Sequence, residues 1–420
     1  MAKKNVYAAL EIADHEVRLV VAEIFNDRSN VLRVERAEHN GIREGKITDE
    51  KAVIQAIEQA VQQAQTALGY RIERVLLAIP AKKVHPVNNR VQIEIEDGTH
   101  TVRRFHVQQG LKSAMMAQRF EKEELVNVNK IDYFIDGIRQ EKIPLGMDTE
   151  VFDMEIDLLY ADKETVYAYA AIVEKAGLQI LDLVLDIYGA AKETGALLQS
   201  KDRPVILIDL EADHTTLAFL NQNKMAFTTV LSKGYSSFIQ SLKEEYSLSD
   251  AAAWRLLENL FDSREVDASD VVLYIEQQED QRVEITKKQL AEAVLPKIRS
   301  WIGDINAGCM PILESTPARY LITGQGTGIP ALRQFVNAFN APASLYHVTT
   351  IGARNGAYVV PLGMMYAWED INQVSNREVT SVNNNELEES IESITRYGKE
   401  QEGGFTKKLR KAMLSNTNKE

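Results

Sequence analysis

The sequence is poor in cysteine and lacks long apolar runs. Cys309 is the single cysteine among 420 residues, which excludes an intrachain disulfide framework and a cysteine-rich zinc site. No stretch reaches the roughly 18 apolar residues of a membrane-spanning helix. We expect no signal peptide, because residues 1–5 lead straight into a strand. With 45% apolar and 26% charged residues, the composition is that of a globular protein.

Positive charge is also scarce. The chain has 48 Lys and Arg against 61 Asp and Glu, a net charge of −13. This balance argues against general nucleic-acid binding, although a basic cluster stands near the C-terminus. At this length we expect two domains, or one domain in several lobes.

Two stretches about 200 residues apart have the same plan. Residues 205–220 have the pattern of a strand, a polar turn and a second strand, and residues 7–23 repeat it. Glu11 in the first copy stands where the second has Asp209. The repetition predicts an internally duplicated α/β fold with a cleft between the halves. The alternative is two ordinary hairpins in a large α/β protein.

Both turns contain the tripeptide Ala-Asp-His, at 13–15 and 212–214. No metal-ligand spacing surrounds either histidine. We therefore interpret His15 and His214 as polar loop residues.

Periodicity and turn residues divide the rest of the chain. Thr48 is expected to cap a helix that begins at Asp49, and residues 186–199 are expected to form one helix. The segment 82–160 interrupts the first half with an alternating strand, a turn and a helix, which predicts an inserted α+β module. The expected parts are the first half, 1–81 plus 161–200; the insertion, 82–160; the second half, 201–371, with a small lobe at about 236–296; a flexible linker, 372–403; and a terminal amphipathic helix, 404–416.

The terminal helix combines an apolar face with positive charge. Phe405, Leu409 and Met413 recur at helical spacing, and the residues around them are the basic Lys407, Lys408, Arg410 and Lys411. A basic amphipathic helix that follows an Asn-, Glu- and Ser-rich linker is typical of a membrane-surface anchor. The alternative is a solvated, frayed basic tail.

Several motifs together carry a resemblance to a known family. The insertion has Asp136-Gly137 followed by Pro144-Leu145-Gly146-Met147, and the second half has Gly352-Ala353-Arg354-Asn355. Residues 321–324, Leu-Ile-Thr-Gly, precede Gly326 and Pro330. Over nearly all of 1–370 the chain resembles FtsA, the actin homologue of bacterial cell division.

The resemblance implies an actin-like fold of the Hsp70/actin ATPase superfamily, with the insertion as an extra subdomain. It also implies a peripheral membrane scaffold at the cytoplasmic face of the cell membrane, at the division site. Such a scaffold self-assembles into filaments, binds anionic lipids, holds the C-terminal peptide of the tubulin-like protein FtsZ, and recruits later division proteins. The peptide site would lie in the small lobe at about 236–296.

The resemblance further implies a nucleotide cleft for ATP and Mg²⁺. The matching positions are Glu11, Asp209, Thr215, Thr216, Gly234, Arg255, Gly324 and Gly326, with Asp209 holding Mg²⁺ through water. Thr215 and Thr216 are equally explained as β-forming residues.

The phosphate loops depart from the family pattern. Glu211 and Asp213 stand where the second loop has glycines, and Ala13 and Asp14 replace the Gly-Thr of the first. Glycines in such loops let backbone N–H groups approach phosphate oxygens, whereas carboxylates repel them. The sequence therefore predicts weak or absent ATP binding and weak or absent ATPase activity, with Lys233 or Arg18 offsetting some of the acidity. Two alternatives are an active ATPase and a pilus assembly platform similar to PilM.

Overall fold

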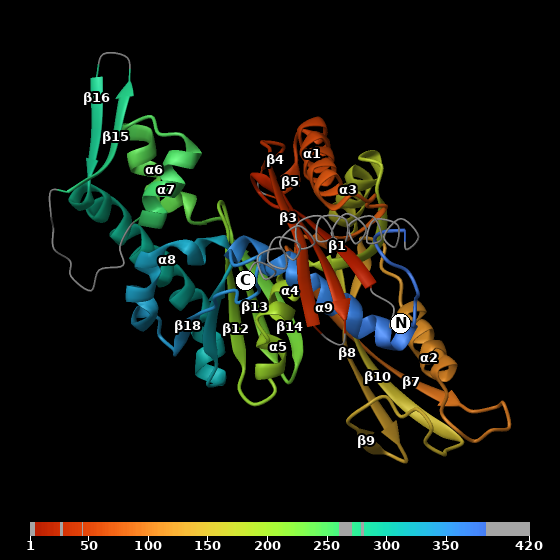
Figure 1. Ribbon diagram of the computed structural model, residues 1–420. Helices are drawn as coiled ribbons and strands as arrows, with labels where there is room; N and C mark the ends of the chain where they lie inside the picture. The colour runs from red at the N-terminus through yellow and green to blue at the C-terminus, as the bar shows by residue number, and fades with distance from the viewer. Residues whose placement is uncertain (1–4, 26–27, 44, 260–270, 279–280, 384–420) are drawn as a thin grey trace, which may run out of the picture.

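The computed structural model describes residues 5–25, 28–43, 45–259, 271–278 and 281–383. The predicted terminal helix and linker residues 384–403 lie outside them. Two five-stranded sheets lie side by side, and a four-stranded sheet extends below the first (Figure 1). No helix in the described part of the chain combines the length and the apolar character needed to cross a lipid bilayer.

The first sheet has the strand order β11-β6-β1-β2-β3. Its buried strands are apolar on both faces, as in sheets covered by helices on either side. The elements of this half are β1 (Asn5–Ile12), β2 (Glu16–Phe25), β3 (Arg28–Glu38), β4 (Ile42–Arg43), β5 (Lys46–Ile47), α1 (Glu50–Leu68), β6 (Arg74–Ile79), α3 (Lys163–Lys175), β11 (Gln179–Leu185), α4 (Asp186–Glu193) and α5 (Ala196–Gln199).

The second sheet has the order β14-β13-β12-β17-β18. The elements from residue 205 onward are β12 (Val205–Leu210), β13 (Thr215–Asn221), β14 (Lys224–Leu231), α6 (Ser236–Glu245), α7 (Asp250–Asn259), β15 (Val272–Gln278), β16 (Gln281–Thr286), α8 (Lys287–Ser315), β17 (Arg319–Thr323), η1 (Gln325–Gly328), η2 (Pro330–Ala338), β18 (Ala343–Leu345), η3 (Gly356–Tyr358) and α9 (Val359–Ser375). The last of them, α9, packs on β1 and β6 of the first sheet.

The two sheets have the same topology. In each, an antiparallel three-stranded meander, β1-β2-β3 or β12-β13-β14, is followed by two parallel strands on the other side of its first strand. The two predicted hairpins are the first pair of each meander. The internal duplication expected from the sequence is therefore present in the fold.

The halves are joined by crossing helices. Helices α4 and α9 cross in direct contact, where Gly363 lies against Gly189. A Cβ at Gly363 would lie 1.8 Å from the carbonyl oxygen of Gly189, so the crossing requires a residue without a side chain.

Residues 82–160 contribute a third sheet, in the order β7-β10-β8-β9. One helix packs on it over a separate apolar core. The elements are β7 (His85–Glu94), α2 (Arg104–Met116), β8 (Glu123–Ile135), β9 (Ile138–Gln140) and β10 (Val151–Asp162). The last strand continues directly into α3 of the first half.

Three local predictions need correction. The N-cap of α1 is Asp49, whose side chain accepts from the Ala52 N–H at 3.1 Å, whereas the Thr48 hydroxyl donates to Gly41. The helix expected over 186–199 is two helices, because Gly195 between them has φ of +65°.

The third correction concerns the linker, which was expected from residue 372. Helix α9 continues to Ser375. Ser381 then accepts the Ala8 N–H on its hydroxyl at 2.8 Å and donates its own N–H to Val6. The chain thus stays packed against β1 as far as Val382, because Ser381 pairs with backbone groups of β1 that precede Ala9 and Leu10, the two residues that pair with β6.

Candidate functional site

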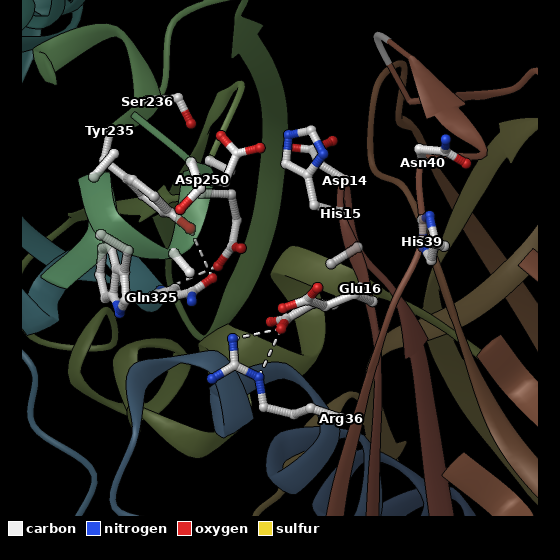
Figure 2. A pocket seen from close by; sticks show the side chains of 18 of the residues that line it. Asp14, His15, Glu16, Arg36, His39, Asn40, Tyr235, Ser236, Asp250 and Gln325 are labelled. Carbon is white, nitrogen blue, oxygen red and sulfur yellow. Dashed lines mark hydrogen bonds and ion pairs between the residues drawn. The ribbon is translucent and has the colours of Figure 1, made fainter. Parts of the chain in front are cut away.

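A cleft of about 1130 Å³ lies between the two halves. Helix α1 and the end of β3 form one wall, and α6 and α7 form the other. Figure 2 shows Asp14, His15 and Glu16 on one side facing Tyr235, Ser236 and Asp250 on the other. The two repeated turns meet at the floor of the cleft, which residues 13–15 of the first turn and Glu211 and Ala212 of the second line.

The two turns are joined to each other by reciprocal pairs. Asp14 Oδ2 lies 2.8 Å from His214 Nδ1 and accepts the Asp213 N–H at 3.1 Å. His15 Nε2 lies 2.9 Å from Asp213 Oδ2. Each turn thus gives one aspartate and one histidine to the other. The interpretation of the histidines as plain loop residues is wrong, because both bind a carboxylate of the opposite half.

Arg18 fills the space beneath these pairs. Its Nε donates to Glu16 at 2.6 Å, its Nη1 to Glu11 at 3.3 Å, and its Nη2 to Glu211 at 2.6 Å. Nη2 also donates to the Gln325 side-chain oxygen at 2.9 Å. Since Arg18 is only 2% exposed, a single guanidinium joins carboxylates of both halves inside the protein. We call Arg18, Glu11, Glu16, Glu211 and Gln325 the Arg18 network.

Strand register places Arg18 at this point. Arg18 on β2 is the direct cross-strand partner of Glu11 on β1, so both side chains project from the same face of the sheet. In the second half the equivalent pair is Asp209 and Thr216. The first half therefore has an arginine where the second has a threonine, and the arginine is long enough to reach the other half.

Burial and charge shift the protonation of this region. Burial, followed by neighbouring carboxylates, raises the pKa of Asp209 well above its usual value. Burial also raises the pKa of Asp186, at the start of α4, to about 6. For His214, burial lowers the pKa but the Asp14 hydrogen bond and charge outweigh it and raise the pKa to about 9. His214 is thus an imidazolium at neutral pH, and the pair with Asp14 is ionic.

The residues predicted to bind a nucleotide lie around the cleft floor. Most of them already contact other protein groups, which take up their hydrogen bonds or the space beside them. The Thr215 hydroxyl donates to the Lys233 carbonyl at 2.7 Å and accepts from Trp301 Nε1 at 3.0 Å. Thr216 is buried in β13. A Cβ at Gly324, which has φ of +89°, would lie 2.4 Å from Asp209 Oδ1. Gly234 and Gly326 likewise pack directly against residues 210–212, and Arg255 is exposed on the α7 wall.

The turns do not fit the phosphates of a nucleotide. Glu211 accepts the Gln325 N–H at 3.1 Å as well as the Arg18 guanidinium, so its carboxylate takes up donors that could otherwise bind a phosphate. Asp209 has one carboxylate oxygen, Oδ1, without a hydrogen-bond partner. Within the described residues, no group of three or more His, Cys, Asp or Glu side chains could hold a metal ion. The predicted Mg²⁺ site at Asp209 thus lacks further protein ligands there.

Several residues of the floor were not predicted from the sequence. Gln325 accepts from Arg18 and also from the Tyr235 hydroxyl at 2.9 Å. Of the two cations suggested as compensating charges, Arg18 has this role and Lys233 does not, because Lys233 pairs with Asp304 at 2.6 Å. One feature of the sequence could have indicated the role of Arg18. It lies opposite Glu11 in a pair of strands whose other residues are mostly apolar.

Comparison with known proteins agrees with the sequence motifs. The chain is 24% identical over 364 residues to cell division protein FtsA of Streptococcus pneumoniae, covering 85% of this chain and 79% of that protein. It is 23% identical to FtsA of Enterococcus faecalis, covering 89% and 86%, and 20% identical to FtsA of Bacillus subtilis, covering 87% and 84%. No protein-family model matches the chain.

Solved structures agree on the fold. A PilM-PilN type IV pilus biogenesis complex is similar with a TM-score of 0.56 at 14% identity, covering 86% of this chain and 98% of that one. MreB5 of Spiroplasma citri bound to ADP is similar with a TM-score of 0.51 at 11% identity, covering 89% and 99%. With its duplicated sheets, the chain has an actin-like fold, and over most of its length it is similar to the cell-division protein FtsA.

Proposed function

We propose that this protein is a cell-division scaffold of FtsA type that works without a bound nucleotide. The observation that carries the second part is the Arg18 network, in which protein groups occupy the place between the two turns. The relatives that support the first part are FtsA proteins matched over most of their length. On this proposal the protein assembles at the inner face of the membrane, anchors FtsZ there and recruits later division proteins.

FtsZ binding is the direct test of the scaffold role. The small lobe formed by α6, α7 and the β15–β16 hairpin would bind the C-terminal peptide of FtsZ. A labelled peptide should bind the full-length protein with saturable affinity, and a scrambled peptide of equal charge should not. Equal binding of both peptides would contradict the proposal. The same result would favour the PilM-like alternative, to which the solved structures lend the fold alone.

Membrane attachment is assigned to residues 404–416. Deleting 404–420 should release the protein from anionic liposomes and leave its thermal unfolding unchanged. Each cation near an anionic surface contributes about 1 kcal/mol, and burying Phe405, Leu409 and Met413 adds roughly 1.5–3 kcal/mol each as an upper range. The measurement is co-sedimentation with liposomes.

The control for this experiment places the same substitution at the neighbouring residue. Phe405→Glu should weaken liposome binding more than Thr406→Glu, because only the first removes an apolar anchor while both add one charge. Equal sedimentation of the full-length and truncated proteins would show that the segment is a solvated tail.

Self-assembly is assigned to two surfaces at opposite ends of the molecule (Figure 1). At the tip of the insertion, Ile138, Leu145 and Met147 are 68%, 41% and 39% exposed, and Val102 hydrogen bonds fix the loop that carries the last two. On the β15–β16 hairpin, Val272 and Ile275 are 37% and 57% exposed. Exposed apolar side chains on ordered backbone are typical of protein interfaces.

Ile138→Lys should weaken self-association on lipid about tenfold, the effect of losing one interface side chain worth between 1 and 2 kcal/mol. Leu198→Lys is the matched control, since Leu198 is 70% exposed on α5, in the first half. Analytical ultracentrifugation with lipid nanodiscs gives the association constants. Equal weakening by both variants would remove the insertion from the interface.

A further inference from the structure

The contacts of Arg18 match the shape of its side chain. A guanidinium is planar and presents five N–H donors in a fixed fork. In this protein Nε, Nη1 and Nη2 each meet a different carboxyl group, from Glu16, Glu11 and Glu211 in that order. A compact ammonium has three donors around one point and could not reach three carboxylates in this fan.

The acceptors come from both halves and are themselves held in place. Glu16 is fixed on its other oxygen by Arg36 Nε at 2.6 Å. Glu211 is fixed by the Gln325 backbone N–H at 3.1 Å, and the Gln325 side chain by the Tyr235 hydroxyl at 2.9 Å. The acceptors around the guanidinium therefore form a prearranged shell, and the cation supplies the contacts that close the cleft floor.

We propose that Glu11, Glu16, Glu211 and the Gln325 side chain form a guanidinium-selective cation site, which Arg18 fills from within and which holds the two halves together. The cation is thus a built-in substitute for a ligand that would bridge the halves. The proposal is independent of the cell-division role, and a failure of FtsZ peptide binding would leave it unchanged.

The far edge of the interface is closed by separate contacts. Asn129 on β8 donates to the Met225 carbonyl at 2.9 Å and accepts the Met225 N–H at 3.0 Å. Lys224 pairs with Asp157 at 3.1 Å, and the Thr228 hydroxyl donates to the Ala81 carbonyl at 3.0 Å. Removing the Arg18 side chain should therefore open the cleft edge while the edge next to the insertion stays closed.

The test uses the full-length Arg18→Ala protein with and without added guanidinium. Hydrogen exchange at the Gln325 and Asp213 amides, whose acceptors are Glu211 and Asp14, reports the cleft edge; exchange at the Met225 amide reports the far edge. In Arg18→Ala, the first two amides should exchange at least about tenfold faster and Met225 should change little. About 20 mM guanidinium chloride, far below denaturing concentrations, should restore slow exchange, and equal ammonium chloride should not.

Matched variants make each outcome decisive. Arg33→Ala removes an arginine that pairs with Glu35 on the surface of β3, and guanidinium should not alter its exchange. If Arg18→Ala fails to fold, it is refolded with each salt, and recovery with guanidinium alone supports the proposal. Arg18→Lys keeps the charge without the fork and should also exchange faster at Gln325. Wild-type exchange in Arg18→Lys, or equal effects of the two salts on Arg18→Ala, would overturn the proposal.

Discussion

Titration with ATP and Mg²⁺ is expected to show binding no tighter than the millimolar range. The γ- and β-phosphates of a nucleotide in the cleft would approach the carboxylates of Glu211 and Asp14. Each like-charge contact at about 4 Å costs on the order of 1–4 kcal/mol at effective dielectric constants of 80 to 20. Calorimetry gives the affinity directly. A micromolar dissociation constant would show that the Arg18 network opens to admit the nucleotide, and would favour the ATPase alternative.

The structure indicates which single change should restore affinity. Replacing Glu211 by alanine removes the carboxylate and leaves the Arg18 Nη2 and the Gln325 N–H available to a phosphate. We expect at least a tenfold gain in ATP affinity, which corresponds to about 1.4 kcal/mol. Glu38→Ala is the control, because Glu38 also lines the cleft and its loss changes the cleft charge equally. Equal gains in both variants would mean that only the overall charge of the cleft matters.

Restoring the whole glycine-rich pattern in both turns should also destabilise the contact between the two halves. Changing Asp14 to Thr and Asp213 to Gly would remove the carboxylates that bind His214 and His15. These changes, together with Ala13→Gly and Ala212→Gly, would loosen the contact between the halves while opening backbone access. Glu211 is therefore the first position to change.

Local patterns predicted the duplicated fold because each hairpin carries its own signal. An apolar run that ends in an acid, followed by a polar turn, fixes the position of Glu11 and Asp209 at strand ends. The resemblance to the FtsA family then marked Glu211 and Asp213 as departures from its glycine-rich phosphate loop. These inferences needed only residues close together in the chain.

The contacts across the cleft could not be predicted in the same way. Arg18 donates hydrogen bonds to Glu211 and to Gln325, which lie 193 and 307 residues further along the chain. Each turn on its own has the sequence of an ordinary polar loop, so the local sequence does not show which residue each histidine binds. The break in the helix at Gly195 was missed for another reason, because a single glycine is tolerated within many helices.

The second large effect expected is a loss of stability between about pH 6.5 and pH 9 from the His214–Asp14 pair. The pKa of His214 is raised from 6.5 to about 9 in the folded protein. A raised histidine pKa means that the stabilisation is complete below the unfolded value and is lost as the pH rises through the folded value. The shift corresponds to about 3 kcal/mol. His214 is 27% exposed at its side chain, so solvent screening reduces this figure only in part.

Other titratable groups near His214 also affect the stability between about pH 6.5 and pH 9. The charges that face His214 are Asp14, Glu211, Asp186 and Asp209, and the raised pKa of Asp209 lets this carboxyl add to the same slope. The pKa of Asp186 rises from 3.8 to about 6 on folding, so most of its effect on stability lies below the window. His15 pairs with Asp213 and its pKa is raised in the same direction, so it adds to the slope.

Urea unfolding of the wild-type protein and of His214→Gln, each at about pH 6.5 and pH 9, isolates the histidine. His214 should contribute a loss of about 3 kcal/mol to the unfolding free energy of the wild-type protein over this range, and His214→Gln should lose that much less, because the contributions of His15, Asp209 and Glu193 are common to both proteins. His100→Gln, at an exposed histidine of the insertion, should behave as wild type. In a double-mutant cycle with Asp14→Asn, the coupling energy should be large at pH 6.5 and much smaller at pH 9, where about half of the imidazolium has lost its proton. A coupling energy that is the same at both pH values would mean that the pair is a neutral hydrogen bond, and the pinning of the two turns would then not depend on charge.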